Sequence, residues 1–455
     1  MVAILAFTGI LGALMQTMVI PIISELPDLL NTSPSNASWV VTATLLSAAI
    51  TTPISGRLGD MFGKRRVLLI CISILAVGCV ICAMTSYLPL FILGRALQGT
   101  AMSVIPLGIS ILRDELRPIR VPTAIALISA TLGGGASIGF PLSAFMAQHF
   151  NFHIVFWAAA VISVILMLLV YNFVPESPIR NPARFDFLGA FGLGAGLLCL
   201  LLPITKGSTW GWTDPEVPGL FAIGLIIIVF WVRYESRIAH PVVQIRTSAS
   251  KPVLLTNITA VLVGFAMFTN NLVLPQLLQA PVGTGYGLGK SMVITGLCLA
   301  PGGFVMMLVS PLAGRISTRH GGKTTLICGL VMIVLTYSVA SLFMDHLWEL
   351  VIVSSLNGAG IGLSYAAMPN LIMASVPITE SAAANGLNAL MRSIGTSTSS
   401  AVMAMILTSM TTTYALQSVP AERAFHYCFG LAAIVGLVAL VVATFIPPRR
   451  IGDAD

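Results

Sequence analysis

Long apolar runs follow one another along almost the whole of this chain. Hydrophobic residues occupy 56% of the 455 positions and charged residues only 9%, whereas soluble proteins carry about 25% charged residues. A run of roughly 20 apolar residues crosses a bilayer core of about 30 Å as a helix. A helix also satisfies its own backbone hydrogen bonds in lipid. The sequence therefore predicts an all-α polytopic membrane protein.

Charged or Pro/Gly-rich breaks divide the runs into fourteen expected transmembrane spans. The first run begins at residue 2 without the basic region or small-residue cleavage site of a signal peptide, so it is expected to be a span. The expected spans are 2–24, 37–57, 66–85, 88–112, 121–147, 152–175, 187–205, 217–235, 252–280, 290–313, 323–344, 348–375, 382–412 and 425–446.

The distribution of cations between the loops predicts the orientation, because Lys and Arg favour cytoplasmic loops. With fourteen spans, eighteen of the 23 cations fall on the side of segment 56–66. Two lie within spans, and the opposite side holds only Lys206, Lys290 and Arg423. Both termini are therefore expected in the cytoplasm, with the protein in the cell membrane. Since these loops explain the net charge of +7, nucleic acid is not an expected partner.

The sequence contains no pattern typical of an enzyme. Its six histidines do not have metal-binding spacing, and its seven cysteines lie in apolar runs, where thiols usually act as small hydrophobes. There is no G-x-S-x-G or phosphate-binding loop motif. We expect neither catalysis nor a cofactor nor a metal site.

Segment 56–66, GRLGDMFGKRR, is more than a basic membrane anchor. It combines four cations with one acid, Asp60, and spaced glycines in what reads as a short turn between spans. A weaker copy, GRISTRHGGK, lies at 314–323 in the second half. Aligning the two Gly-Arg pairs places Gly63 on Gly321 and Asp60 on Thr318. Parallel internal repeats are typical of one transporter architecture.

These residues resemble the major facilitator superfamily. Segment 56–66 matches the pattern G-x-L-x-D-x-x-G-x-[RK]-[RK] between its second and third helices, and GRALQG at 94–99 is similar to its R-x-x-Q-G element. The count of fourteen spans resembles the drug:proton antiporter branch, as does AANGLNALMRSIG at 383–395. The resemblance implies two six-helix bundles, 1–178 and 251–455, joined by two additional spans within 179–250.

The resemblance also implies a function. It is that of a monomeric secondary transporter that exports small, largely hydrophobic or amphipathic compounds by proton antiport and alternating access. Asp60 is expected to reach the N-terminus of a helix in the other bundle, near Ser381, where the helix dipole stabilises a carboxylate by about 0.3–1 kcal/mol. The residues expected to form this conformational latch are Gly56, Arg57, Asp60, Gly63, Lys64, Arg65 and Arg66.

Two departures from the branch leave proton coupling open. Met15 stands where the first helix usually has an acid, and GASIGFPLSA at 135–144 matches the fifth-helix antiporter pattern only in part. Gly135 and Gly139 agree with that pattern, while Pro141 is shifted by one. The alternatives are a facilitator or other small-solute carrier without proton coupling and, less favoured, a membrane sensor or a channel.

Candidate site residues are the charged and polar side chains in or beside the spans. Charges within the bilayer are functional hypotheses by default, the alternative being a structural arginine bonded to backbone carbonyls. Asp114 and Glu115 are expected to pair with Arg113 and Arg117. The coupling or cavity candidates are Arg95, Gln98, Gly99 and Arg392, the proton-site candidates are Glu25 and Asp28, and the substrate-cavity candidates are Gln16, Asn270, Asn271, Gln276, Asn357, Asn385 and Asn388.

Overall fold

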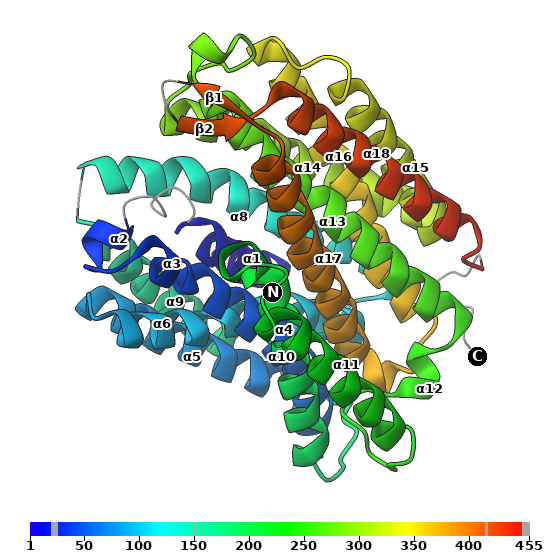
Figure 1. The fold of residues 1–455 in the computed structure, drawn as a ribbon. Coiled ribbons are helices and arrows are strands. Elements are labelled where there is room, and N and C mark those ends of the chain that lie inside the picture. The colour runs from blue at the N-terminus through cyan, green and yellow to red at the C-terminus, as the bar shows by residue number, and fades with distance from the viewer. Residues whose placement is uncertain (20–25, 150, 415–416, 448–455) are drawn as a thin grey trace.

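The computed structural model describes residues 1–19, 26–149, 151–414 and 417–447. Long helices make up nearly all of this part of the chain (Figure 1). The helices are α1 (Val2–Thr17), α2 (Leu26–Leu29), α3 (Pro34–Ala37), α4 (Trp39–Phe62), α5 (Lys64–Met84), α6 (Leu88–Gln98), α7 (Val104–Glu115), α8 (Val121–His149), α9 (His153–Phe173), α10 (Phe187–Trp210), α11 (Glu216–Glu235), α12 (Ile245–Ser248), α13 (Lys251–Gln279), α14 (Met292–His320), α15 (Gly322–Ala340), α16 (Leu347–Met373), α17 (Ser381–Ser409) and α18 (Glu422–Thr444).

Twelve helical segments among the described residues are long and apolar enough to cross a membrane. One of them, Leu88–Glu115, joins α6 and α7 through the 3₁₀ turn Gly99–Ser103. Helix α1 falls outside this set because only 16 residues are helical, and α17 falls outside it although it has 29 residues. The Ser- and Thr-rich sequence of α17 explains its low hydropathy. Fourteen spans therefore remain a prediction.

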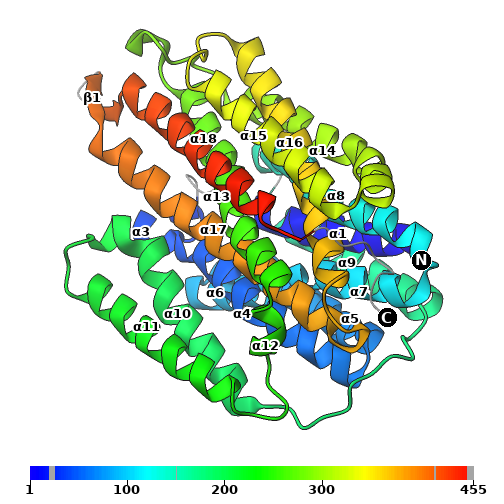
Figure 2. The same ribbon diagram turned by 90° about the vertical axis from the view of Figure 1, so that its right-hand side faces the viewer.

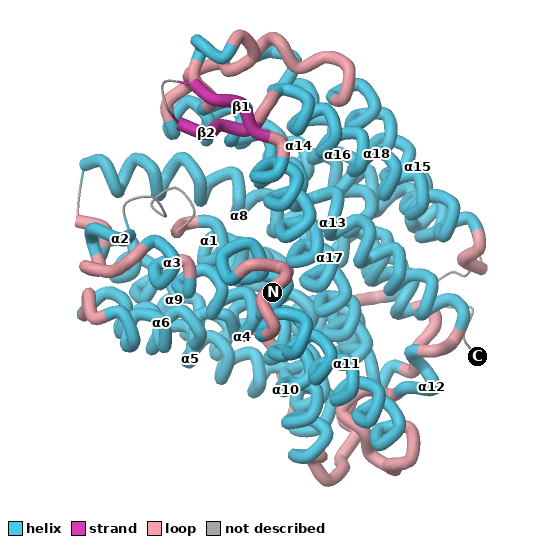
Figure 3. The backbone as a smooth tube through the Cα atoms, in the orientation of Figure 1, coloured by secondary structure: helices cyan, strands magenta, loops and turns pink. Residues whose placement is uncertain are grey.

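A short β hairpin was not expected from the sequence. Strands β1 (Thr411–Tyr414) and β2 (Gln417–Pro420) pair antiparallel between α17 and α18. Figure 3 shows this hairpin in magenta, and it is the only strand pair in the part of the chain described. The expected span 382–412 accordingly ends at Ser409, and its last residues enter the hairpin.

The early and late helices gather in two groups (Figure 1). The two groups meet along two helix pairs, α4 with α17 and α8 with α14. Small and branched side chains of α8, α14 and α16 form one buried apolar cluster across the second pair, made of Ala126, Ala313, Leu363 and Ala366. The close packing of these pairs places the polar residues of both groups at one interface.

Helices α10 and α11 pack beside this interface, as Figure 2 shows for the green helices next to orange α17. Leu193, Leu197 and Leu201 of α10 join one apolar cluster with Leu46 of α4 and Leu390 of α17. Helix α10 therefore contacts both helices of the first pair at once.

Candidate functional site

Segment 56–66 is a junction between two helices rather than an extended turn. Helix α4 continues to Phe62 and α5 begins at Lys64, so Gly63 is the single residue that breaks the helix. Its φ of 113° lies in the region that glycine adopts without steric cost. The expectation of a turn across the whole segment was wrong, and the motif side chains are held on helix ends.

The second copy of the motif has the same backbone. Helix α14 ends at His320, Gly321 has a φ of 86°, and α15 begins at Gly322. The predicted alignment of Gly63 with Gly321 is therefore confirmed. The resemblance extends to packing, because a Cβ on Gly56 would clash with the carbonyl oxygen of Ala382 and one on Gly314 would clash with Thr123.

The carboxylate of Asp60 caps the N-terminus of α17. Asp60 is only 1% exposed, and its Oδ1 and Oδ2 accept hydrogen bonds from the backbone N–H groups of Ala382 and Ala383 at 3.2 and 2.9 Å. The first N–H groups of a helix have no partner within it, and its dipole favours negative charge there. The contact expected between Asp60 and the helix that begins at Ser381 is present.

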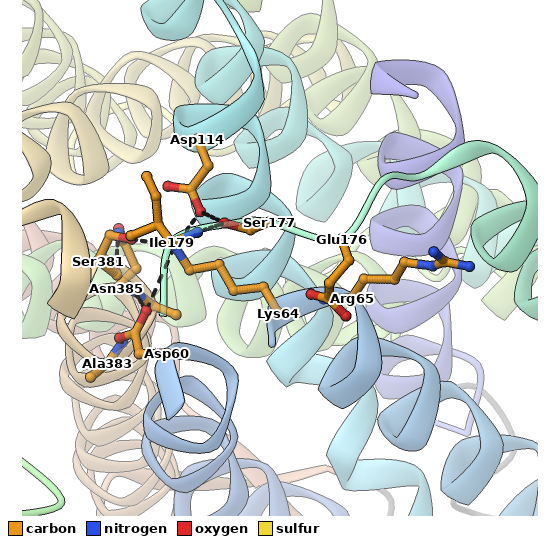
Figure 4. A network of polar contacts seen from close by, with 11 residues as sticks. Asp60, Lys64, Arg65, Asp114, Glu176, Ser177, Ile179, Ser381, Ala383 and Asn385 are labelled. Atoms are coloured by element: carbon orange, nitrogen blue, oxygen red, sulfur yellow. Dashed lines mark hydrogen bonds and ion pairs between the residues drawn. The ribbon is translucent and has the colours of Figure 1, made fainter. Parts of the chain in front are cut away.

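Lys64 lies between two carboxylates and the end of α17 (Figure 4). Its Nζ is 2.5 Å from Asp114 Oδ2 and 3.7 Å from Asp60 Oδ1, and it donates a hydrogen bond to Ser381 Oγ at 3.0 Å. The expectation that Asp114 pairs with neighbouring arginines was wrong. Arg113 instead donates to the carbonyl oxygen of Val376, because α7 ends against the other group of helices.

The segment that follows α9 is also part of this network, which sequence reasoning missed. Glu176 accepts hydrogen bonds from the N–H groups of Arg65 and Arg66 at 3.1 and 3.2 Å, and so caps α5. Ser177 Oγ donates to Asp114, and the N–H of Asn181 donates to the Asp60 carbonyl at 2.7 Å. The sequence offered one signal for this role, because Glu176 is an acidic residue in an otherwise basic loop.

The remaining cations of the motif have different environments. Arg57 is buried and lines a small pocket with Glu380. Arg65 donates to the carbonyl oxygen of Tyr171 and lies over the ring of that residue. The side chain of Arg66 is 68% exposed and 4.0 Å from Glu176.

Arg95 is enclosed by backbone. It is 1% exposed, its Nε donates to the carbonyl oxygen of Val40, and its Nη1 donates to the carbonyl oxygen of Met15 and to Gln98 Oε1. Gln98 Nε2 in turn donates to the carbonyl oxygen of Gly78. Gly99 begins the 3₁₀ turn that follows. Arg95 therefore links α1, α4 and α6. These bonds to backbone carbonyl oxygens fit the structural role that was the alternative to a coupling role.

A cavity of about 50 Å³ lies between α8 and helices of the other group. Asn270, Asn271 and Asn357 line it, together with Gly133 and Met306. Among the described residues, Oδ1 of Asn270 and Oδ1 of Asn357 are buried without a hydrogen-bond partner. Ligand pockets for drug-sized molecules measure about 300–1,000 Å³, so this cavity must widen before such a molecule fits.

A second cluster of polar side chains lies on one face of α17. Arg392 Nη1 donates to Asn388 Oδ1 at 2.8 Å, and Asn388 Nδ2 donates to Asn257 Oδ1 at 2.9 Å. The guanidinium carbon of Arg392 lies 4.9 Å from the centre of the Tyr365 ring. Asn385 donates instead to the carbonyl oxygen of Ser381 in its own helix. The structure thus joins Asn388 and Arg392 and separates Asn385 from them.

The other candidates are dispersed. Gln16 is half-buried in α1, Gln276 is exposed near the end of α13, and Asp28 is exposed in the short helix α2. Glu25 lies outside the described residues. Cβ atoms on Gly135 and Gly139 would contact α1, and Pro141 lies within α8.

Comparison with known proteins identifies the family. The model of the Major Facilitator Superfamily matches residues 5–308 and 256–454. The uridine/deoxyuridine transporter of Lactococcus lactis is 28% identical over 412 residues, which cover 87% of this chain and 83% of that protein. The multidrug resistance protein Stp of Mycobacterium tuberculosis is 24% identical over 379 residues, which cover 81% of this chain and 68% of Stp.

A solved structure agrees on the fold. The human organic anion transporter MFSD10 superposes with a TM-score of 0.66 over 97% of this chain and 98% of that one, at 14% identity. At this identity the likeness concerns the fold alone. The family match and the membrane-length helices together show a multi-pass protein of the cell membrane that transports solutes and is not an enzyme. The chain belongs to the major facilitator superfamily of secondary transporters.

Proposed function

We propose that this protein exports small, largely hydrophobic or amphipathic compounds by alternating access, with proton antiport as the driving reaction. The observation that carries the proposal is the contact of Asp60 in α4 with the first N–H groups of α17. A buried carboxylate of one bundle that caps a helix of the other stabilises one relative position of the two bundles. Opening of this side must break both hydrogen bonds.

The proposed architecture has fourteen spans, which are the twelve membrane-length segments together with α1 and α17. Residues 1–178 and 251–455 would form the two rocking bundles, and 179–250 would form the linking pair α10–α11. Both termini would be cytoplasmic, which places the latch on the cytoplasmic side. A monomer then contains a complete transport path.

Export is supported by the drug-resistance relative and by the apolar composition of the interface. Stp is by its name a multidrug resistance protein. The cavity between the bundles is lined by methionines, glycines and asparagines, without any acidic residue among those described. Such a lining suits molecules with few charges, because flexible methionine side chains repack around varied ligands.

Glu25 and Asp28 are the proposed proton-site candidates, because acidic residues in or beside membrane spans often serve in proton relays. A facilitator without proton coupling is the second candidate. Met15 favours the facilitator, since no acid stands at that position of the first helix, and so does the uridine/deoxyuridine relative.

Dye flux in everted vesicles separates the two candidates. We expect uptake of a hydrophobic dye that stops when an ionophore collapses the proton gradient, and that falls strongly in Glu25→Gln. Glu216→Gln is the matched control, because Glu216 is an exposed acid that is not a proton-site candidate. Uptake that continues at the same rate after collapse of the gradient would rule out antiport and leave the facilitator.

A further inference from the structure

Arg95 and Arg392 lie within helices α6 and α17, and their surroundings differ in kind. Arg95 donates three hydrogen bonds, and only 1% of its surface is exposed. Arg392 donates one hydrogen bond within the described part of the chain, to Asn388, and it is only half-buried. A guanidinium carries five N–H donors, so most of the donors of Arg392 remain for another partner.

The position of Arg392 is fixed although most of its donors have no partner among the described residues. Asn257 of α13 holds Asn388, Asn388 accepts from Arg392, and the guanidinium stacks on the Tyr365 ring of α16. Three helices thereby orient one cationic group. A fixed orientation lowers the entropy that is lost when a ligand binds to it.

Arg392 is linked to the cavity between α8 and the other group of helices through Tyr365 and Met267. The hydroxyl of Tyr365, on which it stacks, donates to the sulfur of Met267, and Met267 lines the cavity. Arg392 is the twelfth residue of α17, about 16 Å along the axis from the first residue at 1.5 Å per residue. Arg392 therefore stands well inside the helix, away from its ends.

None of the described carboxylates forms an ion pair with Arg392. Within the described residues, the ion pairs involve Lys64, Arg66 and His426 but not Arg392. The guanidinium keeps its proton at any physiological pH, so Arg392 cannot itself carry the coupled proton. A permanent, oriented and unpaired positive charge in low dielectric attracts an anion, and its planar fork fits a carboxylate in a bidentate manner.

We propose that Arg392 is the anion-binding group of the substrate site, and that the transported compounds are amphipathic anions with a carboxylate or similarly acidic head group. This inference rests on the proposed function, since it names the substrate class of that same transport path. The apolar part of the compound would occupy the widened cavity beside Met267 and Met306, and its acidic group would reach Arg392.

The test uses three probes with one ring system and different head groups. They are 4-(pyren-1-yl)butanoate, the corresponding uncharged alcohol and the corresponding trimethylammonium cation. Binding to the purified full-length protein in lipid nanodiscs is measured by fluorescence anisotropy. We expect the butanoate to bind roughly tenfold more tightly than the alcohol and the cation to bind least.

Substitutions then assign this preference to one residue. Arg392→Gln should bind butanoate and alcohol equally, and Arg392→Lys should keep part of the difference because it retains the charge without the fork. Arg423→Gln is the matched control, since Arg423 is an exposed arginine of α18. An unchanged melting temperature of Arg392→Gln separates a binding role from a structural one.

The outcomes distinguish this inference from the proposed function. Equal binding of anion and alcohol by the native protein, or tighter binding of the cation, would overturn the role of Arg392 even if everted vesicles export the dye. Conversely, an Arg392-dependent preference for the anion without any gradient-driven flux would support the binding site and contradict the antiporter.

Discussion

Asp60 accepts a hydrogen bond at 2.9 Å from the N–H of Ala383, a residue 323 positions later in the chain. The carboxylate and the helix that it caps belong to opposite halves of the molecule, and both are buried at the contact. Any motion that separates the halves on this side exposes the carboxylate and frees two N–H groups at once. The contact therefore responds to the conformation of the whole transporter.

Replacing Asp60 with Asn should impair transport and leave membrane insertion intact. The amide keeps the size of the side chain but removes the charge that bonds to two N–H groups, and hydrogen bonds to charged groups contribute about 1.5–3 kcal/mol. The balance between closed and open states should shift by roughly tenfold to a hundredfold. Dye flux in vesicles and the yield of monodisperse protein measure the two effects. Asp214→Asn, at an exposed acid, should change neither, and normal flux in Asp60→Asn would reduce the motif to a membrane anchor.

Lys64→Met should be more damaging than the loss of an exposed cation. It leaves Asp60 and Asp114 buried without their shared counter-charge, and breaking a buried pair costs about 3–5 kcal/mol. Arg66→Gln removes a mostly exposed charge and should cost less than about 1 kcal/mol. Thermal unfolding in detergent compares the variants. The double variant Lys64→Met/Asp114→Asn should recover part of the loss, and no recovery would show that this ion pair is not the cause.

Gly56→Ala should prevent closure of the latch while the helix itself remains stable. The added Cβ would meet the carbonyl oxygen of Ala382 across the interface, and backbone cannot move aside as a flexible side chain can. Gly430→Ala is the control, because a Cβ at Gly430 has nothing within 4 Å and alanine favours a helix by about 0.5–1 kcal/mol. We expect strongly reduced flux for the first variant and native flux with a slightly raised melting temperature for the second.

Thr318→Asp should build a second latch. Thr318 occupies the position of Asp60 in the second copy of the motif, and at present its hydroxyl donates to the Gly314 carbonyl of its own helix. Gly314 packs against Thr123 near the N-terminus of α8, where a carboxylate would be stabilised by about 0.3–1 kcal/mol. Slower flux and a higher melting temperature are expected. Thr318→Asn, which lacks the charge, should show neither.

Arg95→Gln should lower stability rather than alter selectivity. The substitution removes donors from the carbonyl oxygens of Met15 and Val40, and each buried acceptor left unsatisfied costs about 1–3 kcal/mol. The melting temperature should fall well below that of the native protein. The residual folded fraction should keep the native order of affinity for the three pyrene probes; a changed order would place Arg95 in the substrate site.

Local chemistry explains what could be predicted from the sequence. Apolar runs are long enough to mark most helices, and the Gly-x-x-x-Asp spacing with its family pattern indicated the partner of Asp60 correctly. Helix α17 is the exception, because its many Ser and Thr residues lower its hydropathy. Hydroxyls of this helix bond to its own carbonyl oxygens, as Ser393 does to Ala389. Such self-bonded residues are polar in composition yet compatible with a helix in lipid.

Long-range contacts explain what could not be predicted. Asp114 has arginines directly beside it in the sequence, but its partner Lys64 lies 50 residues earlier. Arg95 and Arg392 look alike in sequence, as single arginines within apolar runs. Only the neighbours that folding brings to them show that one is enclosed by carbonyl oxygens and that the other presents free donors.

Helix α10 covers only one of the two helix pairs along which the two groups of helices meet. Helix α10 lies against both α4 and α17 through one continuous row of leucines, whereas the described contacts of α8 with α14 include no helix from the linking pair. Near its C-terminal end, α10 contacts the start of α4, because Lys206 donates to Ser38 and lies over the Trp39 ring. Any relative motion of the two groups of helices must therefore move the leucines of α10 along α17, whereas the described contacts give the α8–α14 pair no such cover from the linking helices.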